Sequence, residues 1–522
     1  MRSIAGVSLS LILVALGVAL GVAPAALAEP PPPPPTLESQ LAALWGRAGG
    51  LTAEAVARRA EATSYDVMAR KQDLIAAGAA VDAAKIAFVP RLNLTARYMR
   101  LSSVPKIDFT SSSSTSDAAS LGSLVVTGTL VPAGKSAQPL APCAAPGGMG
   151  CDTLIAVSPS VLSSLFPSFP IPVDNTLMQA SLAVPLTDYL LRLNHAYDAA
   201  GFGRDAAASA ERAARYKVAA DARVLYYTWA RTRLSRFVAE QALVQANGHL
   251  ADVRHLFDVG MVPNADVMRV ESAQAGAELL VEKSRNFERL LADQIRVAMH
   301  ERGGPEFQIG EDLGSDPAPL PDTADTEGLI TSAEAGRLEL ALFRDNDRAL
   351  EAQQKINRAG YLPRIDAFGD AVYANPNQRI FPQKDQFDFT WDVGVQLTYT
   401  PNDVGTTLAN ARTIEARRAS LAAQRGQLLD GIRLEVLQAA SAAREATVAM
   451  KTTARGLKAA EESYRVRREL YVNGRATNIE LTDAENELTR ARLDAIGARL
   501  DLRIAAIRLE HATAADVGGP RN

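Results

Sequence analysis

The chain has 522 residues, a formal net charge of −4 and a mean hydropathy of −0.03. That length suffices for several domains, and a slightly acidic chain without a basic patch is a poor match for nucleic acid. Cys143 and Cys151 are the only cysteines, and both lie in a Pro- and Gly-rich segment without a nearby histidine. They therefore favour a local disulfide over a zinc site, provided that the chain is exported.

The N-terminus has the pattern of a secretory signal peptide. Arg2 precedes an apolar stretch, and Ala26-Leu27-Ala28 supplies the small residues of a cleavage site. The stretch is about long enough to span a bilayer, but no basic cluster stops it. We therefore expect a signal peptide over 1–28 and a stiff, proline-rich spacer over 29–50.

The next segment, 51–302, predicts a helix, two strands and a helical hairpin. Apolar residues at helical spacing predict a helix that ends before Pro90. Alternating apolar and polar residues predict the strands. A Ser-, Pro- and Gly-rich surface loop over 102–175 separates them. The expected helices cover 51–87, 190–257 and 265–300, and the expected strands cover 92–98 and 178–184.

A linker over 303–327 precedes a second copy of this plan over 328–511, and a tail over 512–522 follows. Phe88-Val-Pro90-Arg-Leu is echoed by Tyr361-Leu-Pro363-Arg-Ile. The Gly260 turn is echoed at Gly474. These echoes predict an internal duplication of about two hundred residues. The expected elements are a helix over 328–360, strands over 365–373 and 391–399, a long helix to about residue 471 and a last helix to about residue 511.

The fourth strand alternates without exception, and aromatic residues, Trp391 and Tyr399, end its apolar face. This pattern suits a barrel wall between lipid and water, although a half-buried sheet of a soluble protein alternates in the same way. An unpaired sheet edge cannot face lipid, and single-chain barrels start near eight strands. Four strands that cross a membrane therefore require several copies of the chain, and three copies would supply twelve.

The long helix of the second copy carries a coiled-coil seam. Its residues follow alternating spacings of four and three, and most of them are Ala, so a partner helix can approach closely. An ordinary coiled coil would explain this seam but not the paired strands. The seam comprises Ile432, Val436, Ala439, Ala443, Ala446, Met450, Thr453, Leu457, Ala460 and Tyr464.

Export signal, duplication, paired strands and paired long helices together resemble the TolC-like outer membrane efflux proteins. The resemblance covers about 51–511 and includes the strand exits at Pro185 and Pro401. It implies an α+β membrane protein that forms a homotrimer. Each protomer would contribute four strands to a twelve-stranded transmembrane β-barrel and long coiled-coil helices to a periplasmic tunnel. The implied partners are a periplasmic membrane-fusion adaptor and an inner-membrane efflux pump or ATP-driven exporter.

The resemblance also assigns a periplasmic gate. Glu480 and Asp483 match its acidic residues, and their spacing places both on one helix face. Three copies would form rings of negative charge, although two acids in the first turns of a helix are also ordinary surface residues. Tyr471 matches a latch tyrosine of the family. Ala476 stands where the family has the arginine partner, and the adjacent Arg475 is a possible substitute.

Two turns are expected to contact the adaptor. Their small residues would let a partner hairpin approach the backbone, and a need for positive φ at Gly explains part of the pattern. The expected contact residues are Gly260, Met261, Val262, Gly474, Arg475, Ala476 and Thr477.

No catalytic constellation stands out. The five histidines fall at no metal-ligand spacing and are expected on the surface, and no phosphate-binding loop or cofactor motif is present. The sequence predicts a non-enzymatic exit duct in the outer membrane that serves a tripartite efflux system. The alternatives are the duct of a type I protein secretion system and a secreted coiled-coil scaffold or adhesin.

Overall fold

A computed structural model describes residues 39, 41, 43, 44, 46–102, 173–315, 320–381 and 383–518. These residues form two compact units. The smaller unit combines described residues of Met1–Thr52 with Glu306–Asp316, where Leu51 and Ile309 form a parallel β-bridge. The signal peptide, most of the 102–175 loop and the Cys143–Cys151 pair are predictions that lie outside the described residues.

The larger unit holds two copies of one element series. The elements of the first copy are α2 (Ala53–Thr63), α3 (Tyr65–Ile86), β1 (Arg91–Arg100), β2 (Asp174–Val184), α5 (Leu186–Asp188), the π-helix η1 (Tyr189–Leu193), α6 (Asn194–Asp258) and α7 (Asn264–Ala298). Those of the second are α8 (Thr326–Gly336), α9 (Leu338–Arg358), the 3₁₀ helix η2 (Ala359–Tyr361), β3 (Arg364–Asn375), β4 (Asp388–Thr398), α10 (Asn402–Val472) and α11 (Asn478–Ala512), followed by α12 (Ala515–Gly518). The duplication is confirmed, since α2 and α8 both have 11 residues and α7 and α11 both have 35.

Two helices that periodicity predicts as single are each divided. Ser64 separates α2 from α3, and Arg337 separates α8 from α9; both residues have extended backbone, with ψ of 128° and 121°. The two breaks are 273 positions apart, the same spacing as Pro90 and Pro363. Tertiary contacts explain the second break, because the buried Arg337 donates to the carbonyl of Ala512 and pairs with Glu435.

Glycine does not interrupt the long helix of the first copy. α6 continues through Gly201, Gly203 and Gly248 without a break. Each glycine costs a helix about 1 kcal/mol relative to alanine. The packing of α6 against α7, α9, α3, α11 and α2 outweighs that cost.

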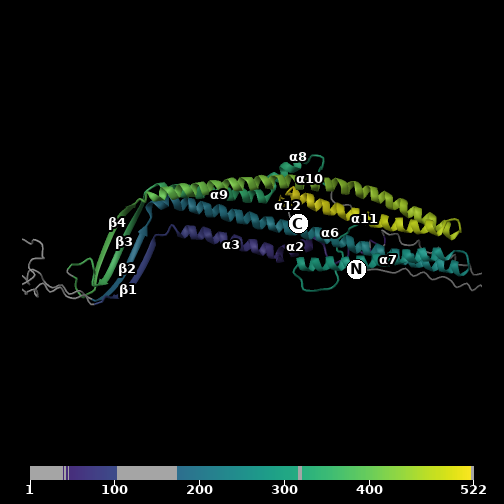
Figure 1. The fold of residues 1–522 in the computed structure, drawn as a ribbon, viewed down its shortest axis with the longest axis horizontal. Helices are drawn as coiled ribbons and strands as arrows, with labels where there is room; N and C mark the ends of the chain where they lie inside the picture. Colours follow the sequence, from purple (N-terminus) through teal and green to yellow (C-terminus); the bar gives the residue numbers. More distant parts are fainter. Residues whose placement is uncertain are drawn as a thin grey trace, which may run out of the picture. The chain divides into compact units, whose positions relative to one another are not determined.

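The four strands form one antiparallel sheet in the order β1-β2-β3-β4, at one end of the helices of this unit (Figure 1). Residues that face each other across the strands share one side of the sheet, for example Leu94 with Ala180 and Ala371 with Trp391. This register places most of the apolar residues of the four strands on one face. They are Leu92, Leu94, Ala96, Tyr98, Met178, Ala180, Leu182, Val184, Ile365, Ala367, Gly369, Ala371, Tyr373, Phe389, Trp391, Val393, Val395 and Leu397.

That apolar face is exposed, and the opposite face carries most of the polar residues of the sheet. Trp391 is 67% exposed and Val393 is 72% exposed. On the polar face, Gln179 donates to Asp370 at 3.0 Å. An exposed apolar face of this extent is unusual for a protein in water, where it marks a surface that contacts lipid or a partner.

The helices next to the sheet keep the order of the strands, since α6 contacts α3 and α9, and α9 contacts α10. At the far end, α6 pairs with α7 and α10 pairs with α11, which gives two helical hairpins (Figure 1). The first half of the predicted seam, from Ile432 to Ala446, is buried against Leu502 and Leu509 of α11 and Ile330 of α8. Among the described helices, none combines the length and the apolar composition that a bilayer crossing needs.

Candidate functional site

Each hairpin ends in a turn that depends on glycine. Gly260 has φ of +75° and Gly474 has φ of +69°, a conformation that L side chains rarely adopt. The hydrogen bonds repeat as well. Met261 N–H donates to Leu256 and Arg475 N–H donates to Leu470, both at 2.8 Å. The positive φ expected at both glycines is therefore confirmed, and the turns end their helices in the same way.

Several apolar side chains are exposed around these turns. Val259, Met261 and Val472 are 69%, 72% and 77% exposed, and Ile479 is 44% exposed. Of the residues expected to contact an adaptor, Val262 instead packs inward against the cluster of Leu250, Val253, Val267 and Val270. Gly260, Met261, Gly474, Arg475 and Thr477 are exposed, and Ala476 is half-buried. Their contact with an adaptor stays a prediction.

The start of α11 is held by a capping box. The hydroxyl of Thr477 accepts from Glu480 N–H, and the Glu480 carboxylate accepts from Thr477 N–H at 3.0 Å. Arg467 of α10 lies 2.7 Å from the same carboxylate. The Thr477 N–H and then Arg467 lower the pKa of Glu480 below its usual value. Glu480 therefore has a structural role in the turn in addition to the gate role expected of it.

Asp483 lies one helical turn after Glu480, and both are exposed. Next to them the two turns touch, because the buried Asn478 of α11 lies 3.4 Å from the carbonyl of Asp266 on α7. The acidic pair thus sits where both hairpins meet. The gate role of Glu480 and Asp483 stays a prediction.

A buried polar group joins the hairpins just behind the turns. His249 of α6 is 5% exposed, and its Nδ1 lies 2.9 Å from Glu485 Oε2 of α11. Since an ionised carboxylate only accepts, Nδ1 carries the proton of this bond. The expectation that the histidines lie on the surface is therefore wrong for His249. Spacing could not reveal it, because its partner is 236 residues away.

Tyr471 belongs to the same group. Its ring lies edge-on to His249, with centroids 5.6 Å apart, and its buried hydroxyl has no hydrogen-bond partner within the described ranges. Burial raises the pKa of Tyr471, with smaller contributions from Asp252, Asp266 and Glu485. The ring beside this tyrosine is therefore that of His249. The latch role of Tyr471 stays a prediction.

A second ion pair joins α6 to α11 nearer the middle of the hairpins, where Arg231 and Asp501 lie 2.6 Å apart. No group of His, Cys, Asp and Glu among the described residues is arranged to hold a metal ion.

Comparisons with known proteins agree with this architecture. Residues 329–515 match the model of the family described as outer membrane efflux protein, which is not a family of enzymes. No curated protein matches the sequence.

Several solved structures share the fold over most of both chains. The outer membrane protein VceC of Vibrio cholerae has 15% identity and a TM-score of 0.66, with 91% of this chain and 98% of that chain covered. The CmeC outer membrane channel of Campylobacter jejuni has 11% identity and a TM-score of 0.66, with 89% and 88% covered. The open state of the MtrE outer membrane channel of Neisseria gonorrhoeae has 13% identity and a TM-score of 0.64, with 88% of each chain covered.

At these identities the structural likeness concerns the fold, and the family match covers the second copy of the repeat. Residues 329–515 therefore resemble an outer membrane efflux protein domain, and the chain shares the α+β fold of these solved outer membrane channels.

Proposed function

We propose that the chain is the outer-membrane exit duct of a tripartite efflux system. The observation that carries this proposal is the apolar, exposed face shared by all four strands, combined with the polar face behind it. A barrel wall in lipid needs this division, with apolar residues outside and polar residues toward the water-filled interior. The long hairpins at the other end of the helices would extend the duct through the periplasm.

The duct would be a homotrimer. Within the described sheet, β1 and β4 each pair with only one strand, and an open edge cannot face lipid. Pairing β4 of one copy with β1 of the next closes the sheet, and three copies supply about twelve strands, within the range of bacterial barrels. The same step places α10 beside the α3 of the next copy, which continues the helix layer around the tunnel.

The apolar turn surface would receive the periplasmic adaptor. Val259 and Met261 of the first hairpin and Val472 and Ile479 of the second are exposed side by side with the glycine turns. Six such hairpin ends in a trimer would offer repeated apolar sites to the helical hairpins of a membrane-fusion adaptor, behind which an inner-membrane pump supplies the energy. The matched family is described as outer membrane efflux protein, and the duct of a type I protein secretion system is the alternative within the same class.

Reconstitution tests the proposal directly. The purified mature chain should migrate as a heat-modifiable oligomer from the outer-membrane fraction and conduct ions in planar bilayers. A lipid-facing sheet also requires detergent for solubility. A chain that stays monomeric, dissolves without detergent and conducts no ions would refute the duct and favour a secreted coiled-coil scaffold.

The acidic pair is proposed to form the gate of this duct. Three copies of Glu480 and Asp483 around one axis would attract cations at the constriction. We expect Glu480→Gln with Asp483→Asn to raise single-channel conductance and to weaken block by hexamminecobalt(III) by about tenfold or more. Glutamine is the right replacement because it can still complete the capping box with Thr477.

The pH dependence of this block provides a second readout. The pKa of Glu480 is lowered, so its negative charge persists below the pH range in which ordinary glutamates protonate. Block should therefore survive moderate acidification and disappear only when the pH falls through that lowered pKa. Asp494→Asn, an exposed acid further along α11, is the matched control and should leave conductance and block unchanged. Unchanged block in the double variant would remove both acids from the constriction.

A further inference from the structure

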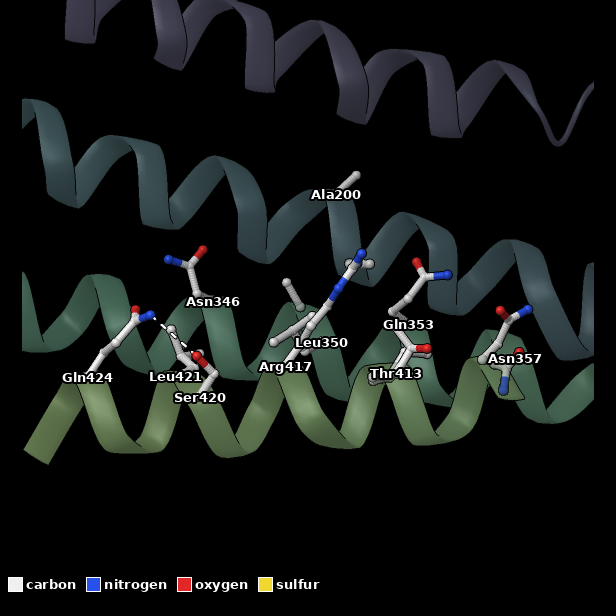
Figure 2. A pocket seen from close by; sticks show the side chains of 14 residues that line it. Ala200, Asn346, Leu350, Gln353, Asn357, Thr413, Arg417, Ser420, Leu421 and Gln424 are labelled. Atoms are coloured by element: carbon white, nitrogen blue, oxygen red, sulfur yellow. Dashed lines mark hydrogen bonds between the residues drawn. The ribbon is translucent and has the colours of Figure 1, made fainter. Parts of the chain in front are cut away.

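A groove of about 940 Å³ lies between α6, α9 and α10, close to the sheet. Its described lining contains amide and hydroxyl side chains but no acidic residue. Arg417 is the one charged side chain in it. Figure 2 shows Arg417 reaching from α10 across the groove toward α6, with Asn346, Gln353 and Asn357 of α9 along the same channel. The volume falls in the range of small-molecule sites.

Arg417 differs from the arginine beside it. Arg418 is held by Asp347 through two contacts of 2.8 and 2.9 Å. Arg417 has no ion pair or hydrogen bond to any residue of the described ranges and is exposed. An unpaired guanidinium that faces neutral amides presents its full charge and its fork of donors to a ligand.

The groove lies on a broad side of the helix layer. α9 is flanked by α6 and α10, so the edges of the layer are α3 and the outer side of α10. Copies that join edge to edge would cover those edges and leave this side open. A second groove on the other side of α9 and α10 includes Glu334 and Ala335 of α8, and it carries charges of both signs. Because α8 adds bulk on that side, the side with Arg417 is the one that would face the bore.

We propose that this groove is a binding station for organic anions that carry several carboxylate or sulfonate groups, with Arg417 as its charge anchor. The location in the bore rests on the proposed duct function. The guanidinium would bind one anionic group in a bidentate manner, and the amides of Asn346 and Gln353 would donate to a second. Three copies would form a ring of positive charge in the bore, and such rings favour anions.

The Arg417 station would attract anions and the acidic turns would attract cations, at two places along one path. Glu480 and Asp483 lie at the far end of the hairpins from the sheet, whereas Arg417 lies in the part of α10 that follows the sheet. A solute that carries both an anionic group and a cationic group would be attracted at both places. A simple anion would be retained only at the station.

The test is block of the reconstituted channel by benzene-1,3,5-tricarboxylate at low ionic strength. We expect the compound to block the wild-type current and Arg417→Gln to raise the half-blocking concentration by about tenfold or more. Arg417→Lys keeps the charge and should stay within about threefold of wild type. Molar salt should abolish the block, since screening then acts within about 3 Å.

Arg418→Gln is the matched control, because it removes a neighbouring cation that lines the second groove instead of this one, and it should leave the block unchanged. Equal block of wild type and Arg417→Gln in conducting channels would overturn the station and leave the duct intact. If the wild type does not conduct, the duct fails. Calorimetric titration of the tricarboxylate into the detergent-solubilised chain then tests the binding site. Loss of binding in Arg417→Gln supports the site, and equal binding in both chains overturns it.

Discussion

Arginine in place of Val393 is expected to prevent the chain from assembling in the outer membrane. Val393 is the middle residue of β4 and is 72% exposed on the apolar face of the sheet. If this face contacts lipid, an arginine there lies at the bilayer midplane, where it costs about 2–4 kcal/mol. A trimer carries three copies, so the assembled barrel loses roughly 6–12 kcal/mol.

The measurement is the fraction of heat-modifiable oligomer recovered from lipid vesicles, together with its unfolding in denaturant. Two further arginine variants make the comparison specific. Gln396→Arg places the same side chain on the polar face of the same strand and should be tolerated. Leu397→Arg stays on the apolar face but near the end of β4, where the cost falls to about 0–1 kcal/mol.

The three variants therefore separate the effect of the sheet face from the effect of depth in the bilayer. A loss that is large at 393, small at 397 and absent at 396 supports a lipid-facing sheet. Equal losses at 393 and 397 would point to an apolar face that packs against protein, since burial in a protein interface does not follow bilayer depth. No loss at any of the three positions would contradict both readings of the apolar face.

Much of this fold could be predicted from the sequence because the two copies support each other. The strand expected over 391–399 alternates without exception, and the structure forms β4 over Asp388–Thr398. The third strand alternates only weakly for a steric reason. Its apolar side carries Ala367, Gly369 and Ala371, which lie opposite bulkier residues of β4 such as Trp391 and Val393. Small residues there leave room for the large ones, so the hydrophobic alternation of the third strand is weaker than that of β4.

Other features were beyond the reach of sequence patterns. The breaks at Ser64 and Arg337 lie within continuous helical periodicity, and only contacts with distant segments reveal them. The groove around Arg417 is lined by residues of three helices that are far apart in the sequence. The role of Glu480 in a capping box is written in the local sequence as Thr477-x-x-Glu480. The capping box is therefore a local signal, separate from the gate role that the resemblance implies for the same residue.

The pair of His249 and Glu485 is expected to hold the two hairpins of one protomer together. The histidine is 5% exposed, and the side chain of Glu485 is 16% exposed. A hydrogen bond to a charged group in such a site contributes about 1.5–3 kcal/mol. Its removal also leaves the carboxylate beside Tyr471 without a donor. No other described residue of α6 binds Glu485 through a side-chain hydrogen bond or ion pair in the structure.

We therefore expect His249→Leu to raise amide hydrogen exchange in the ends of α6 and α11 together, by roughly 10- to 150-fold. The prediction has a matched control in His255→Leu, an exposed histidine further along the same helix. Glu485→Gln should reproduce the effect in part, because an amide accepts less strongly than a carboxylate. The double variant should be little worse than His249→Leu alone, because both changes remove one interaction.

The comparison of the two single variants with the double variant also shows whether the His249–Glu485 pair connects the hairpins or His249 only fills space. If His249 only filled space, the exchange would rise in α6 alone, and the effects of the two single variants would add. If the pair joins the hairpins, both turns loosen at once. In a duct, that loosening would reach Asn478 and Glu480 at the proposed gate, because Asn478 contacts the Asp266 carbonyl across the same interface. Conductance of the His249→Leu channel should therefore exceed that of wild type in the absence of any adaptor, while His255→Leu should not change it.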